Sequence, residues 1–257
     1  MALEKSIIHA RASGDPRRVT SSLNSLADLL CFQGDLENAE QTFRECLEIS
    51  RTMQDHYGAA VHLNNIGTVF HMQKKLDDAA FAYQESLNLC RKYGDRYGES
   101  IALSNLGEIA IENGDYKHAG FCFEEGLSIS EEIANTWSTL ACLGNLAEIS
   151  FLSKKYGAAR MHLSRALQTA LDTDTVTILP KLLLLNARMD LENHHKNRAA
   201  SVLAQILYTE DIDELIRTQT SELVDKYSLT LPPAFSKDLK SSAATILHTL
   251  EEESAEQ

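Results

Sequence analysis

Three asparagines stand at a regular spacing and could hold another polypeptide. Asn65, Asn105 and Asn145 are separated by 40 residues each, and Ser25 takes the same place one step earlier. A side-chain amide both donates and accepts hydrogen bonds, so a row of amides can bind the main chain of a segment whatever its sequence. The alternative is that these asparagines cap or bridge neighbouring helices.

Further polar residues recur beside the asparagines and extend this candidate surface. Asp28, Thr68, Glu108 and Glu148 keep the same period, one helical turn further along. The three carboxylates among them favour a basic partner, or one with a well-placed Arg or Lys, although a solvated acidic face has the same pattern. The predicted partner-binding residues are Asn24, Asp28, Asn64, Asn65, Thr68, Ser104, Asn105, Glu108, Asn145 and Glu148.

Motifs of catalysis and metal binding are absent from the sequence. It contains no Gly-x-x-x-x-Gly-Lys-Ser/Thr, no Gly-x-Ser-x-Gly, no His-Glu-x-x-His and no Cys-x-x-Cys. The adjacent His194 and His195 stand in a polar turn without a carboxylate or thiol at ligand spacing, which favours two solvated side chains over a metal site. We therefore expect a non-catalytic protein with no cofactor and no metal.

The candidate residues are predicted to lie on helices. Within each 40-residue unit, apolar residues fall at helical spacings in two runs, such as 23, 26, 27 and 30 and then 36, 39, 43 and 47. A turn such as Asn113-Gly114-Asp115 joins the two helices, with glycine ending one and aspartate capping the next. Small residues let the paired helices approach closely: Gly67, Gly107 and the column Ala39, Ala79, Ala119, Ala159 and Ala199.

The composition agrees with an all-α protein. The 257 residues include only four Pro and twelve Gly, and 44% are hydrophobic, which is enough to bury a core. A formal charge of −13 argues against nucleic-acid binding, which needs clustered Lys and Arg. No apolar run reaches the ~18 residues of a membrane span, and five cysteines, an odd number, favour reduced thiols that pack inside a cytoplasmic protein. Tyr57, Tyr97 and Trp137, at the starts of successive first helices, are expected to pack against the preceding unit.

Two stretches resemble the tetratricopeptide repeat (TPR): residues 63–67 (LNNIG) and 103–107 (LSNLG), each followed by the alanine column. The resemblance implies a right-handed α-solenoid of TPR helix hairpins with C-terminal capping helices. It also implies that the asparagines lie on the inner, concave surface formed by the first helices. In the kinesin-light-chain and cell-polarity adaptor groups of 40-residue repeats, a comparable asparagine row holds a peptide, which implies the same role here.

The period divides the chain into four predicted regions. Residues 1–13 are expected to form the second helix of an incomplete repeat, and 14–174 four complete repeats. Residues 175–209 are expected to form a degenerate fifth repeat, and 210–257 capping helices and an acidic tail. A start in mid-repeat is typical of a piece of a longer protein or of an edge that binds a partner.

The end of the chain supports a narrower resemblance. Residues 202–208 (VLAQILY) and 231–235 (LPPAF) resemble the C-terminal TPR region of bacterial signal-transduction ATPases and transcriptional regulators. This implies a protein- or peptide-binding sensor or interaction module. Two alternatives stay open: a peptide-pheromone receptor of the Rap type, and an assembly scaffold that self-associates through its N-terminal helix.

Overall fold

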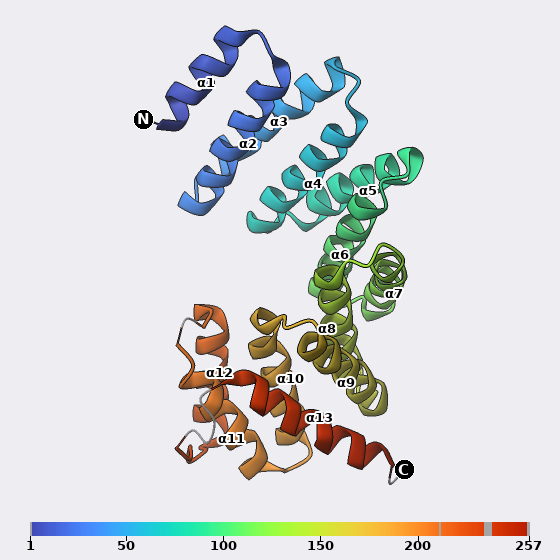
Figure 1. Cartoon of the computed structure of the whole chain (residues 1–257), viewed down its shortest axis with the longest axis vertical. Helices are drawn as coiled ribbons and strands as arrows, with labels where there is room; N and C mark the ends of the chain where they lie inside the picture. Colours follow the sequence, from blue (N-terminus) through green and yellow to red (C-terminus); the bar gives the residue numbers. More distant parts are fainter. Residues whose placement is uncertain (1, 211, 234–237, 256–257) are drawn as a thin grey trace. The chain divides into compact units, whose positions relative to one another are not determined.

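The computed structural model of the chain is built from consecutive helices (Figure 1). The structure describes residues 2–210, 212–233 and 238–255, and every element within those ranges is helical. The α-helices are α1 (Ala2–Ser13), α2 (Pro16–Gln33), α3 (Leu36–Thr52), α4 (His56–Met72), α5 (Leu76–Tyr93), α6 (Arg96–Glu112), α7 (Tyr116–Glu132), α8 (Thr136–Leu152), α9 (Tyr156–Asp172), α10 (Leu179–Glu192), α11 (Lys196–Leu207), α12 (Glu214–Tyr227) and α13 (Leu239–Ala255).

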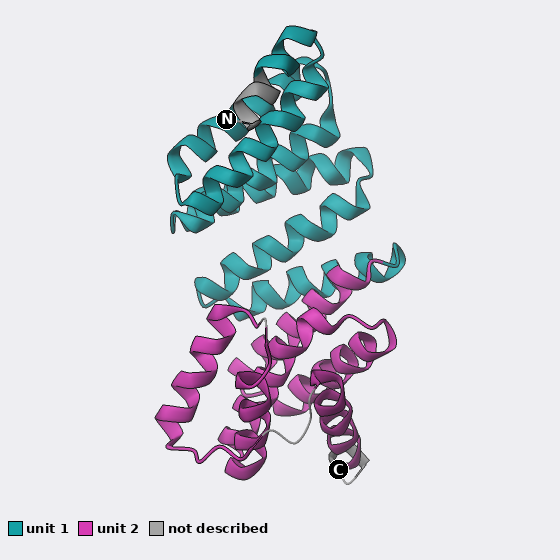
Figure 2. Cartoon of the chain, turned by 60° about the vertical axis from the view of Figure 1, so that its left-hand side comes forward, with its two compact units in different colours: residues 1–134 teal, residues 135–257 magenta. Residues whose placement is uncertain are grey.

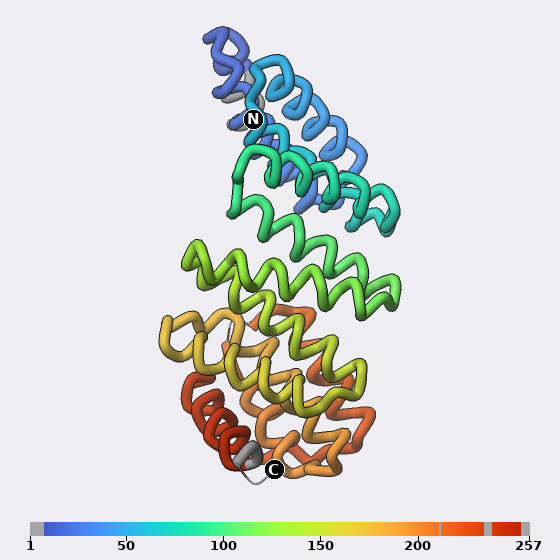
Figure 3. Tube along the Cα trace, turned by 90° about the vertical axis from the view of Figure 1, so that its right-hand side faces the viewer, coloured from blue at the N-terminus to red at the C-terminus, as the bar shows by residue number. Residues whose placement is uncertain are grey.

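The helices form two compact units, residues 1–134 with α1 to α7 and residues 135–257 with α8 to α13 (Figure 2). In the first unit α2 packs on α3, α4 on α5 and α6 on α7. The second unit repeats this hairpin with α8 and α9 and again with α10 and α11. Within each unit the hairpins follow one another along the trace (Figure 3). The predicted all-α fold of stacked TPR-type hairpins is confirmed.

Short turns join the two helices of each hairpin, and their residues explain where the helices end. Gly34 and Gly114 take left-handed φ angles of 78° and 74°, a conformation that glycine adopts without steric cost. Asp35 and Asp115 then cap the next helix, because each carboxylate accepts the backbone N–H three residues further on. These caps were predictable from the Gly-Asp pairs.

The turn between α8 and α9 has neither the glycine nor the capping aspartate. Lys154 takes a left-handed φ of 58°, and Lys155 stands at the N-cap of α9 without a side-chain hydrogen bond. We expect the double substitution Lys154→Gly and Lys155→Asp to raise the free energy of unfolding by about 1–2 kcal/mol, because it relieves the backbone and adds a cap. Urea unfolding followed by circular dichroism measures the change.

The control for this prediction is the reverse exchange in the turn between α6 and α7. Gly114→Lys with Asp115→Lys should destabilise the protein by a similar amount, since it removes the same two features. An unchanged unfolding midpoint in both double variants would contradict the assignment of these roles to glycine and aspartate.

Close approach inside two hairpins of the first unit depends on glycine. A Cβ added at Gly67 would lie 2.7 Å from the ring of Tyr83, and one added at Gly107 would lie 2.6 Å from the ring of Phe123. Both rings are buried, so the two small residues are packing positions as predicted. The alanine column is buried as well, in Ala39, Ala79, Ala119, Ala159 and Ala199.

An ion-pair network joins the ends of α5, α6 and α7. The carboxylate of Glu99 is 6% exposed and accepts from Nε of Arg91 at 2.9 Å and from Nη1 of Arg96 at 2.8 Å. The two guanidinium groups also reach Glu125 and Glu132 on α7. A buried carboxylate needs such partners, because desolvation alone disfavours its charge.

The second unit ends in elements that depart from the repeat. A short 3-10 turn, Val176–Ile178, precedes α10, and α13 packs on α9, α10 and α11. The last helix, α13, begins at Leu239, and residues 234–237 lie outside the described residues. In the described part of the chain, no helix combines the length and the apolar character that crossing a membrane requires.

Candidate functional site

The predicted asparagines of the first unit bridge consecutive first helices. Asn65 on α4 donates from Nδ2 to Oδ1 of Asn24 on α2 at 3.2 Å. Asn105 on α6 donates in the same way to Asn64 on α4 at 2.8 Å. Each bond runs back to the residue 41 positions earlier in the chain. All four side chains are half-buried, so these amides hold neighbouring repeats together and still reach the surface.

The other predicted residues of the first unit lie along the same helices. Asn24 donates to the carboxylate of Asp28 at 2.9 Å, and partial burial raises the pKa of Asp28 above that of an ordinary aspartate. Thr68 donates to the main chain one turn earlier in α4, and Ser104 on α6 is half-buried. Glu108 is exposed, so it and Asp28 are the carboxylates that this surface presents to solvent.

A pocket of about 190 Å³ opens beside the amides of α4. Asn64 and Asn65 line it together with the apolar residues Val61, Tyr97 and Ile101. Val61 is 50% exposed and Tyr97 is 57% exposed, so both offer apolar surface to a bound molecule. The repeat pattern did not predict this pocket, although Val61 and Ile101 stand one period apart and Tyr97 belongs to the aromatic column.

The rings of the aromatic column are more exposed than the predicted packing against the preceding unit implies, although Tyr97 does lie beside α4 and α5 of that unit. Tyr57, Tyr97 and Trp137 are 54%, 57% and 59% exposed. The hydroxyl of Tyr57 donates to the carbonyl of Tyr93, at the end of α5, so its polar contact is with the following helix. A residue in the first turn of a helix projects beside the loop, where few neighbours can cover a large ring.

In the second unit, two predicted residues already have basic partners. Asn145 is 4% exposed, and its Oδ1 accepts from Nζ of Lys181 at 3.0 Å. Glu148 accepts from Nη1 of Arg188 at 2.8 Å, and this guanidinium also lies 5.2 Å from the ring centre of Phe151. Glu148 therefore adds little attraction for a basic ligand. Arg188 was not among the predicted residues, although it stands one period after Glu148.

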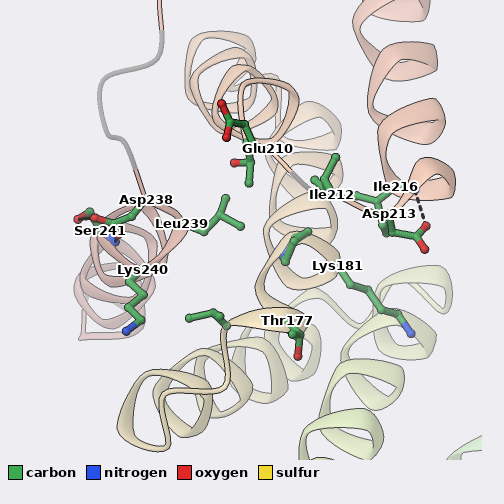
Figure 4. A pocket seen from close by; sticks show the side chains of 13 residues that line it. Thr177, Lys181, Glu210, Ile212, Asp213, Ile216, Asp238, Leu239, Lys240 and Ser241 are labelled. Carbon is green, nitrogen blue, oxygen red and sulfur yellow. Dashed lines mark hydrogen bonds between the residues drawn. The ribbon is translucent and has the colours of Figure 1, made fainter.

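A cavity of about 940 Å³ lies among α10, α12 and the start of α13 (Figure 4). Leu239 faces its centre, whereas the amino group of Lys181 points away from Leu239. Lys240, on the rim, pairs with Asp174. Residues 211 and 234–237, which adjoin the lining in the chain, lie outside the described residues. The cavity is thus an apolar space among the capping helices, whose charged rim makes contacts within the protein.

Histidines and cysteines have packing or pairing roles. His195 lies 3.7 Å from a carboxylate oxygen of Asp190, so a carboxylate does stand near this turn. Within the described ranges, no group of three or more His, Cys, Asp or Glu side chains could hold a metal. Burial raises the pKa of the Cys46 thiol to about 12, which keeps it protonated at neutral pH. The other buried thiols are Cys90, Cys122 and Cys142.

Comparison with known families identifies the repeat. Two models described as tetratricopeptide repeat match the chain, one over residues 18–92 and the other over residues 101–133. Among curated protein sequences, none matches this chain.

Solved structures share the fold at low sequence identity. BtubC (BKLC) from P. vanneervenii is 16% identical with a TM-score of 0.69, over 92% of this chain and 94% of that one. The apo form of RapI is 15% identical with a TM-score of 0.68, over 95% of this chain and 67% of that one. A Signal Transduction ATPase with Numerous Domains from Pyrococcus horikoshii, which has a tetratricopeptide repeat sensor, is 16% identical with a TM-score of 0.59. The match covers 83% of this chain and 37% of that one. Residues 18–92 and 101–133 therefore match tetratricopeptide repeats, and the fold of the chain is similar to that of a signal-transduction ATPase with a tetratricopeptide repeat sensor.

Proposed function

We propose that the first unit binds a segment of another protein through the amides of α4 and the pocket between α4 and α6. Val61, Tyr97 and Ile101 offer an apolar seat for one side chain of that segment. Asn64 and Asn65 then hydrogen-bond its main chain with the amide groups that remain open to solvent. The observation that carries the proposal is the placement of half-buried amides beside an exposed aromatic ring in one pocket.

The charge of the first unit supports a basic partner. Residues 1–134 contain 21 Asp and Glu against 12 Lys and Arg. Asp28 and Glu108 are exposed along the same first helices as the amides. A segment with Lys or Arg beside its apolar anchor would meet complementary charge there, which favours encounter and orientation.

Panning a phage-displayed library of random peptides on the intact chain tests this proposal. We expect the enriched peptides to combine an apolar residue with a neighbouring Lys or Arg. Tyr97→Ser should weaken the binding of a selected peptide about tenfold or more, because truncating an aromatic anchor at an interface removes a large share of its affinity. Isothermal titration calorimetry measures this change.

Tyr57→Ser is the matched control. Tyr57 occupies the same column and is 54% exposed, against 57% for Tyr97, but it does not line the pocket. Its replacement should leave the affinity unchanged, and both variants should keep the thermal midpoint of the parent. Equal losses in the two variants, or a library that yields no enriched peptide, would refute the proposed pocket. Substitutions at Asn64 and Asn65 are less informative, since they also remove bonds between helices.

Segment binding would make the chain a non-catalytic sensor or interaction module. The likeness to a signal-transduction ATPase with a tetratricopeptide repeat sensor supports a place in a signalling regulator, and control of transcription is one role that such a regulator could have. The cysteines carry free thiols, which suits a reducing compartment such as the cytoplasm. The fold similarity to RapI favours a second candidate, a receptor for short peptides. A one-to-one complex with a peptide shorter than about ten residues would distinguish it from a protein-binding module.

A further inference from the structure

One face of α2 is open at a position that later repeats bury. Leu29 is 38% exposed, whereas Val69 and Ile109, one and two periods later, are 0% and 3% exposed. In α4 and α6 this position is buried, and each of these helices packs on the second helix of the preceding repeat and is also bonded through an amide to its first helix. At the end of α2, Phe32 is 90% exposed. In the described part of the chain, α2 has no preceding first helix to cover this face (Figure 1).

The open face has the spacing of a helix-packing seam. Its residues follow one another at intervals of four, three, four and three, which places them on one side of an α-helix. Two large apolar side chains occupy the C-terminal half of the stripe, and two small serines occupy the middle. The α2 stripe consists of Arg18, Ser22, Ser25, Leu29 and Phe32.

We propose that the α2 stripe joins two copies of this chain, packed antiparallel about a two-fold axis. With the centre of the contact near residue 27, Phe32 of one copy faces Ser22 of the other, and Leu29 faces Ser25. Both large apolar side chains then meet a serine, so the two helices can approach closely without a clash. The stripe is thus complementary to itself, which a two-fold contact requires.

The charges of α2 select the antiparallel direction. Its first turn contains Arg17 and Arg18 and no acidic residue, although the positive end of the helix dipole disfavours cations there. Asp28 and Asp35 stand toward the other end of the helix. An antiparallel neighbour brings its acidic, C-terminal end beside these arginines and offsets their unfavourable position. A parallel neighbour would place like charges together.

This contact shares Asp28 with the acidic surface of the first unit but does not use the proposed peptide pocket. It does not use Asn64, Asn65 or Tyr97, so a protein that binds no peptide could still dimerise. One helix face per copy covers less surface than a standard interface, and we expect a reversible dimer with a dissociation constant on the order of micromolar.

Sedimentation velocity of the intact chain, from about 1 to about 200 μM, tests the proposal around that expected constant. We expect a reversible monomer–dimer equilibrium. Leu29→Glu with Phe32→Glu should raise the dissociation constant about tenfold or more, because it replaces the two apolar side chains of the contact by carboxylates that lose their hydration there. Ser25→Phe should also raise the dissociation constant without adding a charge, since the new ring fills the space of the opposing Leu29. Both sites are open in the monomer, so helix content and thermal midpoint should stay unchanged.

Phe81→Glu with Phe121→Glu is the matched control. These rings are 70% and 62% exposed on α5 and α7, so the change in charge and apolar surface is the same on another face. The control should leave the association unchanged. A monomer at every concentration would overturn the proposal. It would indicate that the α2 stripe packs against a helix of a different protein. Association that the control abolishes, or that survives either α2 variant, would also overturn it.

Discussion

Replacing Gly107 by alanine should lower the free energy of unfolding by about 1–3 kcal/mol, although the change adds a single methyl group. The new Cβ would lie 2.6 Å from Cζ and 2.7 Å from Cε1 of Phe123. That ring is 0% exposed, so it could move only by displacing other close-packed groups. Alanine otherwise stabilises a helix interior by up to about 1 kcal/mol relative to glycine. A loss of stability in this variant can therefore be attributed to the clash with Phe123. Urea unfolding measures it.

Two further variants make this prediction specific. Gly157→Ala introduces the same methyl group in α9, where nothing lies within 4 Å of the new atom, and it should be neutral or stabilising. Adding Phe123→Leu to the Gly107→Ala chain should recover part of the loss, because leucine vacates the space of the ring edge. A Gly107→Ala protein as stable as the parent would show that α6 and α7 can separate without cost.

Arg91→Met should cost about 1.5–3 kcal/mol of stability, because it removes a charged hydrogen bond from a buried carboxylate. Glu99 is 6% exposed and would keep Arg96 alone as its partner. Arg91 is itself 43% exposed, so solvent screens part of its charge and the lower half of this range is expected. Chemical unfolding at neutral pH measures the change.

The pair can also be removed as a whole. Adding Glu99→Ala to the Arg91→Met chain should restore most of the stability, because the same position one period earlier is Ala59. Arg51→Met is the matched control, since Arg51 precedes Arg91 by one period and pairs with the exposed Glu48. Its loss should cost less than about 0.5 kcal/mol. An effect at Arg51 as large as that at Arg91 would indicate that packing of the arginine stem, and not the buried carboxylate, sets the cost.

The helices and their turns could be predicted because each repeat shows the same spacing of apolar and small residues. In a column such as Ala79 and Ala119, the same residue type recurs at the same position of successive repeats, so one atypical residue does not change the prediction. The Gly-Asp turns specify both a helix end and a cap. The site was predicted less completely. The period places Asn65 and Asn105 on the correct helices, but it does not say that each amide reaches 41 residues back. That contact depends on the distance between neighbouring helices, which no single repeat contains.

Two kinds of feature could not be predicted from the sequence: the exposure of aromatic residues at helix starts, and the pairing of side chains from different repeats. Tyr97 has the spacing of a packing residue and yet is 57% exposed, because it stands in the first turn of its helix, where few neighbours can cover a large ring. Arg188 and Glu148 keep the period, but opposite charges one repeat apart neutralise each other only when both side chains extend along the same surface. Long flexible side chains make such contacts in several ways, and their spacing in the sequence does not choose among them.

The bonds between the asparagines of the first unit have a direction. Asn65 donates toward Asn24, and Asn105 donates toward Asn64, so the amide dipoles point the same way at both steps. The main chain of a bound segment also has polarity, because its N–H and C=O groups occur in a fixed order. The two senses in which a segment could run along this row are therefore not equivalent. We expect one sense to dominate, so that a peptide and its reversed sequence would be told apart even when they present identical side chains.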